Sequence, residues 1–473
     1  MANKAHTFQS FPSASIGWIA LLSWNLFALG SLGQSSAPFR IEVIERSSRW
    51  PVPMVELRTT HEARFVSDND GVVSFDLPEL MNQEVWFFVE SPGYEVRPDG
   101  FGLKGVRLKA TPGGRASIEV DRTMIAKRIG RLTGSGLFAE TQKSGGRTDH
   151  QDLPWVGCDS VQSTQLGSSR LWLWGDTTMA RYPLGNFDMS GATTPNDLIF
   201  PAQPPVAMRY NLYLNDQGRP RGLAPIEGEG PTWLTGLATL PDRNGKEHVV
   251  ACYRKIRPPL STYEIGLCVW NESSKQFERL HVLWKEDQGP APTLLPEGHS
   301  IVLNSEKGGE LLFGNPLPRL RCPATFEDWQ NSQQWKAIDA PSKVQSLDRK
   351  SIEPHTGSIG WHAARKKWVC IFMENFGKPS PFGELWYCES DSPLGPWANA
   401  IKVLSHTNYT FYNPRLLLEV TPPDAPYLLF EGTYTQQFAN KPFPTPRYDY
   451  NQMLYRVDYS EIDQAIKAST GVP

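Results

Sequence analysis

Acidic residues stand beside short apolar strands at several places along this 473-residue chain. Asp176 in WGDT, Glu374 in FMEN and Glu431 in FEGT each follow such a strand. Asp159 in VGCDS and Glu229, just ahead of PTW, each precede one. Hydrolysis of a glycosidic bond needs a carboxylic acid that protonates the leaving oxygen and a second carboxylate that attacks the sugar or activates water. These five carboxylates are therefore the candidate catalytic residues.

The neighbours of the strand-end carboxylates indicate roles for them. Aromatic residues flank Glu374 and Glu431, and an apolar surround raises the pKa of a carboxyl group, as a general acid requires. Asp176, close to Trp174, suits the base or nucleophile. Polar residues at strand ends also satisfy turns by hydrogen bonding to the backbone, so a structural role is the alternative for each.

Residues with aromatic rings or hydrogen-bonding groups accompany the same strands. The candidates for substrate binding are Trp174, Trp233, His355, Tyr412, Asn413 and Arg415. The rings would stack on sugars, His355 would orient a carboxylate or bind a hydroxyl group, and Arg415 would hold a substrate carboxylate in a bidentate pair. The alternatives are core packing for alternate aromatic residues of a strand, a local hydrogen bond for His355 and a salt bridge between repeats for Arg415.

The strand that ends at Asp176 belongs to a repeated pattern. Its sequence, SSRLWLWGDTT at 168–178, recurs at 308–316, 365–375 and 425–433, with a weaker copy at 246–255. Five such units, with four short strands as the repeating pattern, predict a five-bladed β-propeller over residues 153–473. A large sandwich and a parallel β-helix are the alternatives. Pro-rich insertions at 180–230 and 434–451 interrupt the units, and long loops of this kind are often functional.

Residues 37–121 have the pattern of a separate all-β domain. Short strands at 39–45, 54–60, 71–77, 85–91 and 105–110 are separated by turn signals such as Asn-Asp-Gly and Ser-Pro-Gly. This spacing predicts a β-sandwich, and residues 122–152 then form a linker to the propeller.

The first 36 residues are typical of a targeting segment. An apolar run at 16–32 is followed by small residues, as in a secretory signal peptide. We therefore expect a secreted, periplasmic or cell-surface protein without a stable membrane span after cleavage. An uncleaved anchor is the alternative, because the run is nearly long enough to cross a bilayer.

Two resemblances follow from these motifs. LWLWGDT, ELWYCESDSPLGPW and FYNPRLLLEV with YLLFEGTYT resemble the five-bladed propeller clan of secreted glycosidases, which includes arabinanases, xylosidases and invertases. The resemblance implies three catalytic acids, the first on the opening blade, where Asp159 and Asp176 stand; the clan's usual Asp-Pro pattern is absent there. VPMVELRTT, SDNDGVVSF and FFVESPGYEV resemble the carboxypeptidase-regulatory, transthyretin-like sandwich, which implies a binding or spacer module.

Composition excludes some partners and leaves others open. The formal charge is −3 and no long basic stripe is present, which argues against a nucleic-acid partner. No Cys or His cluster has zinc-ligand spacing, so we expect no cofactor. A structural calcium ion is the alternative, because carboxylate and carbonyl oxygens are its usual ligands.

The six Cys residues include two pairs, Cys252/Cys268 and Cys370/Cys388, that flank hairpin loops. Each pair could form a disulfide or remain as two buried thiols.

The sequence as a whole favours a carbohydrate-active protein that works as a monomer. The leading hypothesis is a glycoside hydrolase that cleaves a poly- or oligosaccharide with paired carboxylates at the propeller axis. A carbohydrate- or protein-binding propeller without catalysis is the alternative, and a tethered structural surface protein is a third hypothesis. Because propellers have many functions, the fold alone does not choose between them.

Overall fold

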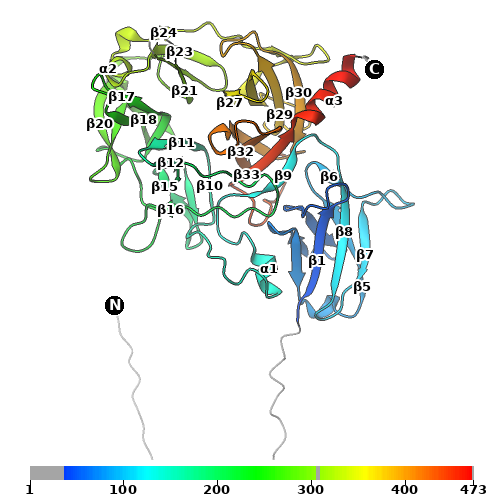
Figure 1. Cartoon of the computed structure of the whole chain (residues 1–473). Coiled ribbons are helices and arrows are strands. Elements are labelled where there is room, and N and C mark those ends of the chain that lie inside the picture. The colour runs from blue at the N-terminus through cyan, green and yellow to red at the C-terminus, as the bar shows by residue number, and fades with distance from the viewer. Residues whose placement is uncertain (1–36, 305–308, 471–473) are drawn as a thin grey trace, which may run out of the picture. The chain divides into compact units, whose positions relative to one another are not determined.

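The computed structural model describes residues 37–304 and 309–470, and strands dominate these residues. An N-terminal β-sandwich is followed by a five-bladed β-propeller, as the sequence predicts (Figure 1). The predicted signal peptide, residues 1–36, lies outside the described residues.

The sandwich consists of two four-stranded sheets around one apolar core. The first sheet has the order β4 (Val72–Phe75), β1 (Phe39–Glu45), β8 (Arg115–Arg122) and β6 (Tyr94–Glu95). The second has the order β3 (Arg64–Val66), β2 (Glu56–Thr59), β5 (Glu84–Glu90) and β7 (Gly105–Lys109). Every second residue of β1, including Ile41 and Val43, points inward, and Leu57 and Phe87 meet them from the second sheet.

The propeller has five four-stranded antiparallel blades. Blade 1 is β11 (Val161–Leu166), β12 (Ser169–Trp174), β15 (Ser190–Pro195) and β16 (Asn211–Leu212). Blade 2 is β17 (Thr232–Pro241), β18 (Glu247–Arg257), β19 (Ser261–Asn271) and β20 (Gln276–Lys285). Blade 3 is β21 (His299–Leu303), β22 (Glu310–Gly314), β23 (Pro318–Pro323) and β24 (Lys336–Ala337). Blade 4 is β27 (Pro354–His362), β28 (Lys367–Glu374), β29 (Glu384–Ser390) and β30 (Ala398–Ser405).

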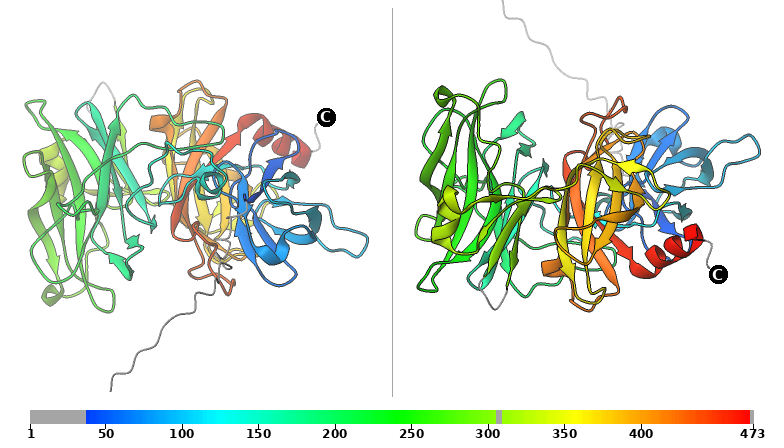
Figure 2. Two further views of the ribbon diagram at one scale, coloured as in Figure 1. Left: turned by 90° about the horizontal axis from the view of Figure 1, so that it is seen from below. Right: turned by 90° about the horizontal axis from the view of Figure 1, so that it is seen from above.

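Blade 5 closes the ring with a strand from far upstream. It consists of β31 (Thr410–Leu416), β32 (Tyr427–Thr435), β33 (Asn451–Asp458) and β9 (Lys127–Arg131). Cyan β9 lies beside red β33 in Figure 1, and Met453 pairs with Arg131 across them. The segment 122–152, which the sequence leaves as a linker, therefore supplies the outer strand of the last blade. The sandwich that precedes β9 lies beside the orange and red strands of this blade (Figure 2).

Blade 1 differs from its predicted extent. The Pro-rich insertion at 180–230 is not wholly a loop, because it contains β14 (Tyr182–Asn186) and the two outer strands β15 and β16. The sequence of β15, SGATTP, has no run of large apolar side chains, so the hydrophobic pattern does not reveal it.

Apolar cores fill the spaces between neighbouring blades. Five clusters of buried residues lie in the described structure at the interfaces of blades 1 and 2, 2 and 3, 3 and 4, 4 and 5, and 5 and 1. Successive side chains of β12 point into two of these cores. Leu171 and Leu173 face blade 2, whereas Trp172 and Trp174 face blade 5. Both faces of a middle strand are thus buried, and its aromatic residues are core residues.

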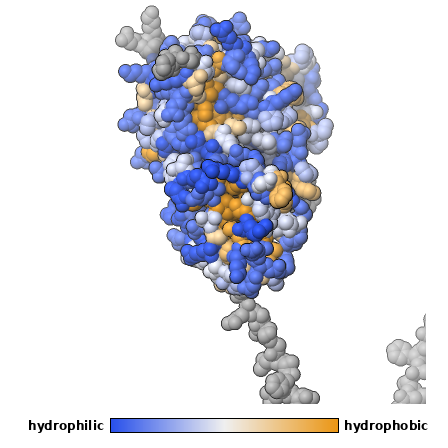
Figure 3. All heavy atoms as spheres, turned by 90° about the vertical axis from the view of Figure 1, so that its right-hand side faces the viewer, coloured by the Kyte–Doolittle hydropathy of each residue, from blue (hydrophilic) through white to orange (hydrophobic). Residues whose placement is uncertain are grey.

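Short elements complete the described chain. They are β10 (Gly157–Cys158), which pairs with β13 (Thr177–Met179), the hairpin β25 (Val344–Gln345) and β26 (Ser351–Ile352), and the helices α1 (Ala139–Lys143), α2 (Phe326–Gln330) and α3 (Tyr459–Thr470). Single 3-10 turns lie at Pro78–Leu80, Glu286–Gln288, Ser332–Gln334 and Leu418–Val420. No helix in the described ranges has the length and apolar character needed to cross a membrane. On the face in Figure 3, apolar residues form separate areas within a largely hydrophilic surface.

All six Cys residues are free and buried, and the blade geometry distinguishes the two suggested pairs. Cys252 faces the core between blades 2 and 3, whereas Cys268 faces the core between blades 1 and 2. Their side chains lie on opposite faces of the sheet, which excludes a disulfide between them. Cys370 and Cys388 lie directly opposite each other across β28 and β29 and share one core.

We expect native protein to be inert towards a water-soluble thiol reagent, because burial raises the pKa values of Cys252 and Cys370 and blocks access to their thiols. A thiol titration without reductant should give no reaction in buffer and all six thiols in denaturant. A bridge between Cys370 and Cys388, which the geometry allows, would leave only the remaining thiols to react in denaturant and would contradict the free-thiol structure.

Candidate active site

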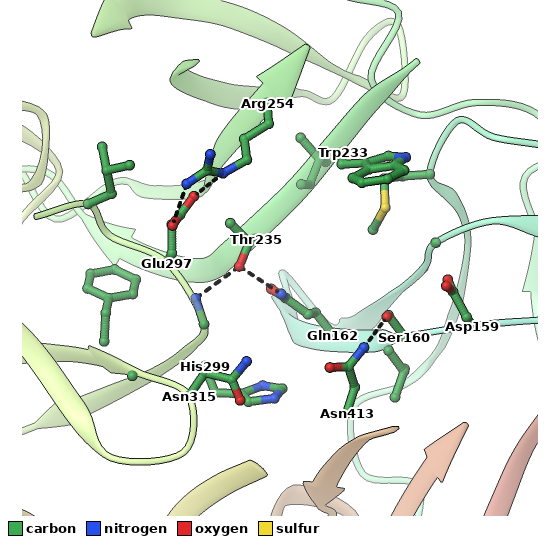
Figure 4. Close-up of a pocket in the computed structure, with 18 of the residues that line it drawn as sticks. Asp159, Ser160, Gln162, Trp233, Thr235, Arg254, Glu297, His299, Asn315 and Asn413 are labelled. Carbon is green, nitrogen blue, oxygen red and sulfur yellow. Dashed lines mark hydrogen bonds and ion pairs between the residues drawn. The ribbon is translucent and has the colours of Figure 1, made fainter. Parts of the chain in front are cut away.

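A cavity of about 580 Å³, the main cavity of the site, opens where the inner strands of the blades begin. Its walls come from blades 1, 2 and 3 and from the start of β31 in blade 5. The polar and aromatic residues that line it and are labelled in Figure 4 are Asp159, Ser160, Gln162, Trp233, Thr235, Arg254, Glu297, His299, Asn315 and Asn413. Asp176, Arg319 and Tyr412 line it as well. The volume suits a small ligand such as one or two sugar rings.

Asp159 and Asp176 lie together because of the β11–β12 hairpin. Val161 pairs with Trp174, so the residues just before β11 and just after β12 meet at the same end. The backbone N–H of Asp159 donates to the carbonyl of Asp176 at 3.1 Å. The Asp159 carboxylate folds over Gly175, where a Cβ atom would lie 2.1 Å from Oδ1; glycine is required there for this placement.

Two tyrosines hold the Asp159 carboxylate. The hydroxyl groups of Tyr412 and Tyr450 each donate to Oδ2 of Asp159 at 2.7 Å. Burial raises the pKa of Asp159, and the two hydroxyl hydrogen bonds oppose this rise because they favour the charged form. Tyr450 comes from the Pro-rich insertion at 434–451, so this loop supplies part of the site.

Asp176 has a different environment from its neighbour. Burial and, to a lesser degree, the negative charge of Asp159 raise its pKa to about 7, and the nearby Trp233 indole partly opposes the rise. Its Oδ1 atom is buried and has no hydrogen-bond partner among the described residues. Of the two carboxyl groups, Asp176 is therefore the one that holds a proton near neutral pH.

The wall opposite this pair is organised by fixed polar contacts. Arg254 of β18 donates through Nε and Nη2 to the two carboxylate oxygens of Glu297 at 2.6 and 2.9 Å (Figure 4). Thr235 Oγ1 accepts from the backbone N–H of Gly298 at 2.9 Å and from the Gln162 amide at 3.4 Å. These contacts join blades 1, 2 and 3 and fix the shape of the cavity.

The far end of the cavity approaches a second one. Gln162 and His299 line both the main cavity and another of about 310 Å³, which lies towards the opposite ends of the inner strands. Burial lowers the pKa of His299 to about 3, so its imidazole is neutral at physiological pH. The paired carboxylates belong to the main cavity alone.

The structure brings five of the predicted site residues together in the main cavity: Asp159, Asp176, Trp233, Tyr412 and Asn413. The Trp233 indole N–H donates to the Phe187 carbonyl at 3.2 Å, which fixes its ring in the wall. Asn413 donates from its side chain to Ser160 Oγ at 2.5 Å.

Three predicted catalytic carboxylates lie outside this cavity. Glu229 is exposed on the segment before β17. Glu374 ends β28 and accepts from the Trp386 indole N–H at 2.8 Å. Glu431 is buried in β32, 3.5 Å from the Arg415 guanidinium, and burial raises its pKa to about 7.

Three predicted binding residues also lie outside it. Trp174 is buried between blades 5 and 1, because its strand is covered on both faces. His355 is exposed, with its ring 5.3 Å from that of Phe382. Arg415 lines the second cavity, where its guanidinium pairs with Glu419.

Glu297 contributes a cavity carboxylate that the sequence did not single out. Glu297 stands two residues before the inner strand β21, just as Asp159 stands two residues before β11. This equivalent position in the repeat is the signal that identifies it. Within the described ranges, no group of three or more His, Cys, Asp or Glu side chains is arranged to hold a metal ion.

No protein-family profile and no curated sequence matches the chain. Among solved structures, it is similar to an exo-β-1,3-galactanase from Phanerochaete chrysosporium (10% identity, 70% of this chain and 64% of that chain covered, TM-score 0.40). It is also similar to an N-acetylgalactosamine deacetylase from F. plautii (9% identity, 73% of this chain and 99% of that chain covered, TM-score 0.39). A third similar structure is an exo-1,5-α-L-arabinanase from a bovine ruminal metagenomic library (11% identity, 65% of this chain and 94% of that chain covered, TM-score 0.37). The chain spans less than two thirds of the galactanase. Similarities this low do not indicate an activity, and the architecture above rests on the sheets themselves.

Proposed function

We propose that this protein is a glycoside hydrolase that acts on poly- or oligosaccharides in the main cavity. The observation that carries the proposal is the pair Asp159 and Asp176, two half-buried acidic residues at neighbouring strand ends whose environments differ. One accepts two tyrosine hydrogen bonds and the other has a pKa of about 7. Such a difference assigns one group as the acid and the other as the base or nucleophile.

The proposed reaction divides the work between the two groups. Asp176 donates its proton to the glycosidic oxygen as the bond to the anomeric carbon breaks. Asp159 either takes a proton from the water that attacks this carbon, or attacks the carbon itself and forms a glycosyl ester that water then cleaves. In both cases the water supplies the hydroxyl group of the new reducing end. The sequence favoured Asp176 as the base or nucleophile; its unpaired, buried Oδ1 atom and its raised pKa favour the role of the acid instead.

The proposal includes the expected ligand, cofactor, location and oligomeric state of the protein. The ligand is a carbohydrate, Trp233 stacks on a sugar ring, no cofactor takes part, and the protein acts as a secreted or cell-surface monomer. A binding propeller without catalysis is the rival, since Glu374 and Glu431 do not join the carboxylate pair.

A product-release screen tests the proposal. Protein would be incubated with linear arabinan, β-1,3-galactan, xylan and oligosaccharides derived from them, and new reducing ends would be counted. Release from at least one glycan supports hydrolysis. Binding without release from any of them would contradict it and would favour the binding propeller.

The pH dependence of hydrolysis follows from Asp176. Its folded pKa of about 7 lies above the ordinary value, so the required acid form is present below pH 7 and is lost as the pH rises through 7. We expect kcat/KM to fall about tenfold per pH unit above this pKa. A profile that stays flat from about pH 7 to about pH 9 would contradict the assignment of Asp176 as the acid.

A further inference from the structure

Three phenylalanines form a cluster near the cavity that the proposed reaction does not use. Phe382 is flanked by Phe376, with ring centroids 5.2 Å apart, and by Phe438, at 6.3 Å. Phe376 is 72% exposed and Phe438 is 77% exposed, so both rings offer most of their surface to solvent. His355 adds its ring to the same group, 5.3 Å from Phe382.

The fold does not require these two exposed side chains. Phe376 has φ = 51° and Phe438 has φ = 56°, which is the left-handed region that favours Gly or Asn. A bulky residue there is strained, and burial does not offset the strain because both rings are exposed. Strained residues of this kind concentrate at functional sites, so the two positions are better explained by binding than by stability.

The loop that carries Phe438 is held in place. Asp449 accepts from the backbone N–H of Gln436 at 2.6 Å and from the Thr435 hydroxyl at 3.2 Å. The Gln437 carbonyl accepts from the Thr410 hydroxyl at 2.5 Å. A loop fixed in this way presents its aromatic ring at low entropic cost to a ligand.

The cluster is continuous with the rim of the main cavity. The Phe382 carbonyl accepts from the N–H of Phe411 at 2.7 Å, and the next residue, Tyr412, lines the cavity and binds Asp159. On the other side, the backbone N–H of cavity residue Asn413 donates to Thr356 Oγ1 at 3.2 Å, next to His355. A chain that leaves the cavity over β31 therefore reaches these rings.

We propose that the cluster of Phe376, Phe382 and Phe438 binds sugar rings of a glycan chain that extend beyond the main cavity. This inference rests on the proposed carbohydrate ligand and adds that the ligand is a polymer. Exposed aromatic faces suit the apolar C–H faces of sugars, and the exposed pair of Glu353 and Asn375 nearby offers hydrogen bonds to hydroxyl groups.

Binding measurements on the full chain test this inference without relying on turnover. Parent protein carrying Asp176→Asn would be compared with the same protein carrying Phe376→Ala and Phe438→Ala. Isothermal titration would use linear arabinan, β-1,3-galactan and xylan, each beside its trisaccharide. Phe101→Ala is the matched control, because Phe101 is 93% exposed but lies in the sandwich hairpin before β7.

The double substitution should weaken binding of the preferred polymer by about tenfold, the loss expected when two aromatic contacts of this size are removed. Trisaccharide affinity should stay within about twofold, and Phe101→Ala should change neither value. An equal loss for polymer and trisaccharide, an unchanged polymer affinity, or no binding of any polymer by the parent would overturn the inference. Polymer binding that depends on the cluster in a protein without hydrolytic activity would refute the hydrolase proposal alone.

Discussion

Replacing Asp176 with Asn is expected to lower kcat by about 10²–10⁴-fold, the range that one positioned acid contributes. The amide has nearly the same shape as the carboxyl group but cannot donate the catalytic proton. Because Oδ1 of Asp176 has no hydrogen-bond partner in the described structure, the substitution breaks no hydrogen bond at that atom. The free energy of unfolding should therefore change little, and KM should stay near its original value. Product release and urea denaturation of the same preparation check both statements.

Two carboxylates outside the cavity serve as controls for Asp176→Asn. Glu229→Gln changes an exposed residue, and Glu374→Gln changes a residue whose partner is Trp386 rather than a cavity group. Both variants should retain kcat within about a factor of two. A large loss in Glu374→Gln together with normal activity in Asp176→Asn would move the catalytic site away from the main cavity.

Replacing Arg128 with Met is expected to lower the free energy of unfolding by about 3–5 kcal/mol, because several buried neutral acceptors lose hydrogen bonds from a charged donor, each worth about 1.5–3 kcal/mol. Arg128 is 1% exposed in β9 and joins the propeller to the sandwich. Its guanidinium donates to the carbonyls of Pro53 (3.0 Å) and Pro92, to the Ser91 hydroxyl (2.8 Å) and to the Tyr455 hydroxyl (3.1 Å). Methionine fills the space but leaves these acceptors unpaired inside the protein.

Denaturation in urea measures this effect, and Arg49→Met is the control. Arg49 lies on the sandwich surface with 60% of its side chain exposed and pairs with Glu119. Exposed ion pairs contribute little, so this variant should unfold like the original protein. Equal stability of Arg128→Met and Arg49→Met would show that the buried contacts do not hold the sandwich and the propeller together.

The sequence predicts the strands of the propeller well where the strands are buried on both faces. Leu171 to Trp174 and the apolar run of β32 stand out because blade cores cover both sides of a middle strand. It predicts outer strands poorly, as β15 shows, since these are short and carry small polar residues. The pairing of β9 escapes prediction for another reason: its partner β33 lies near the other end of the chain, and only the closed ring brings them together.

The sequence predicts those residues of the candidate site that lie at the ends of paired strands. Asp159 and Asp176 follow from one hairpin, and local sequence suffices to place them side by side. Trp174 shows the limit of the same reasoning, because the burial of both strand faces cannot be read from a single strand. Glu431 and Arg415 show a second limit: they pair with each other within blade 5, where Glu431 is buried and Arg415 lines the second cavity instead of the main one.

A crystal structure of the Asp176→Asn protein with an oligosaccharide from the hydrolysis screen would show whether a sugar chain lies between Asp159 and residue 176. We expect a glycosidic oxygen within about 3 Å of the amide group that replaces the Asp176 carboxyl group, in the cavity lined by Trp233. We also expect an anomeric carbon that faces Asp159. Sugar density confined to the second cavity beside Arg415, or to the sandwich, with the main cavity free of it, would contradict hydrolysis by this carboxylate pair.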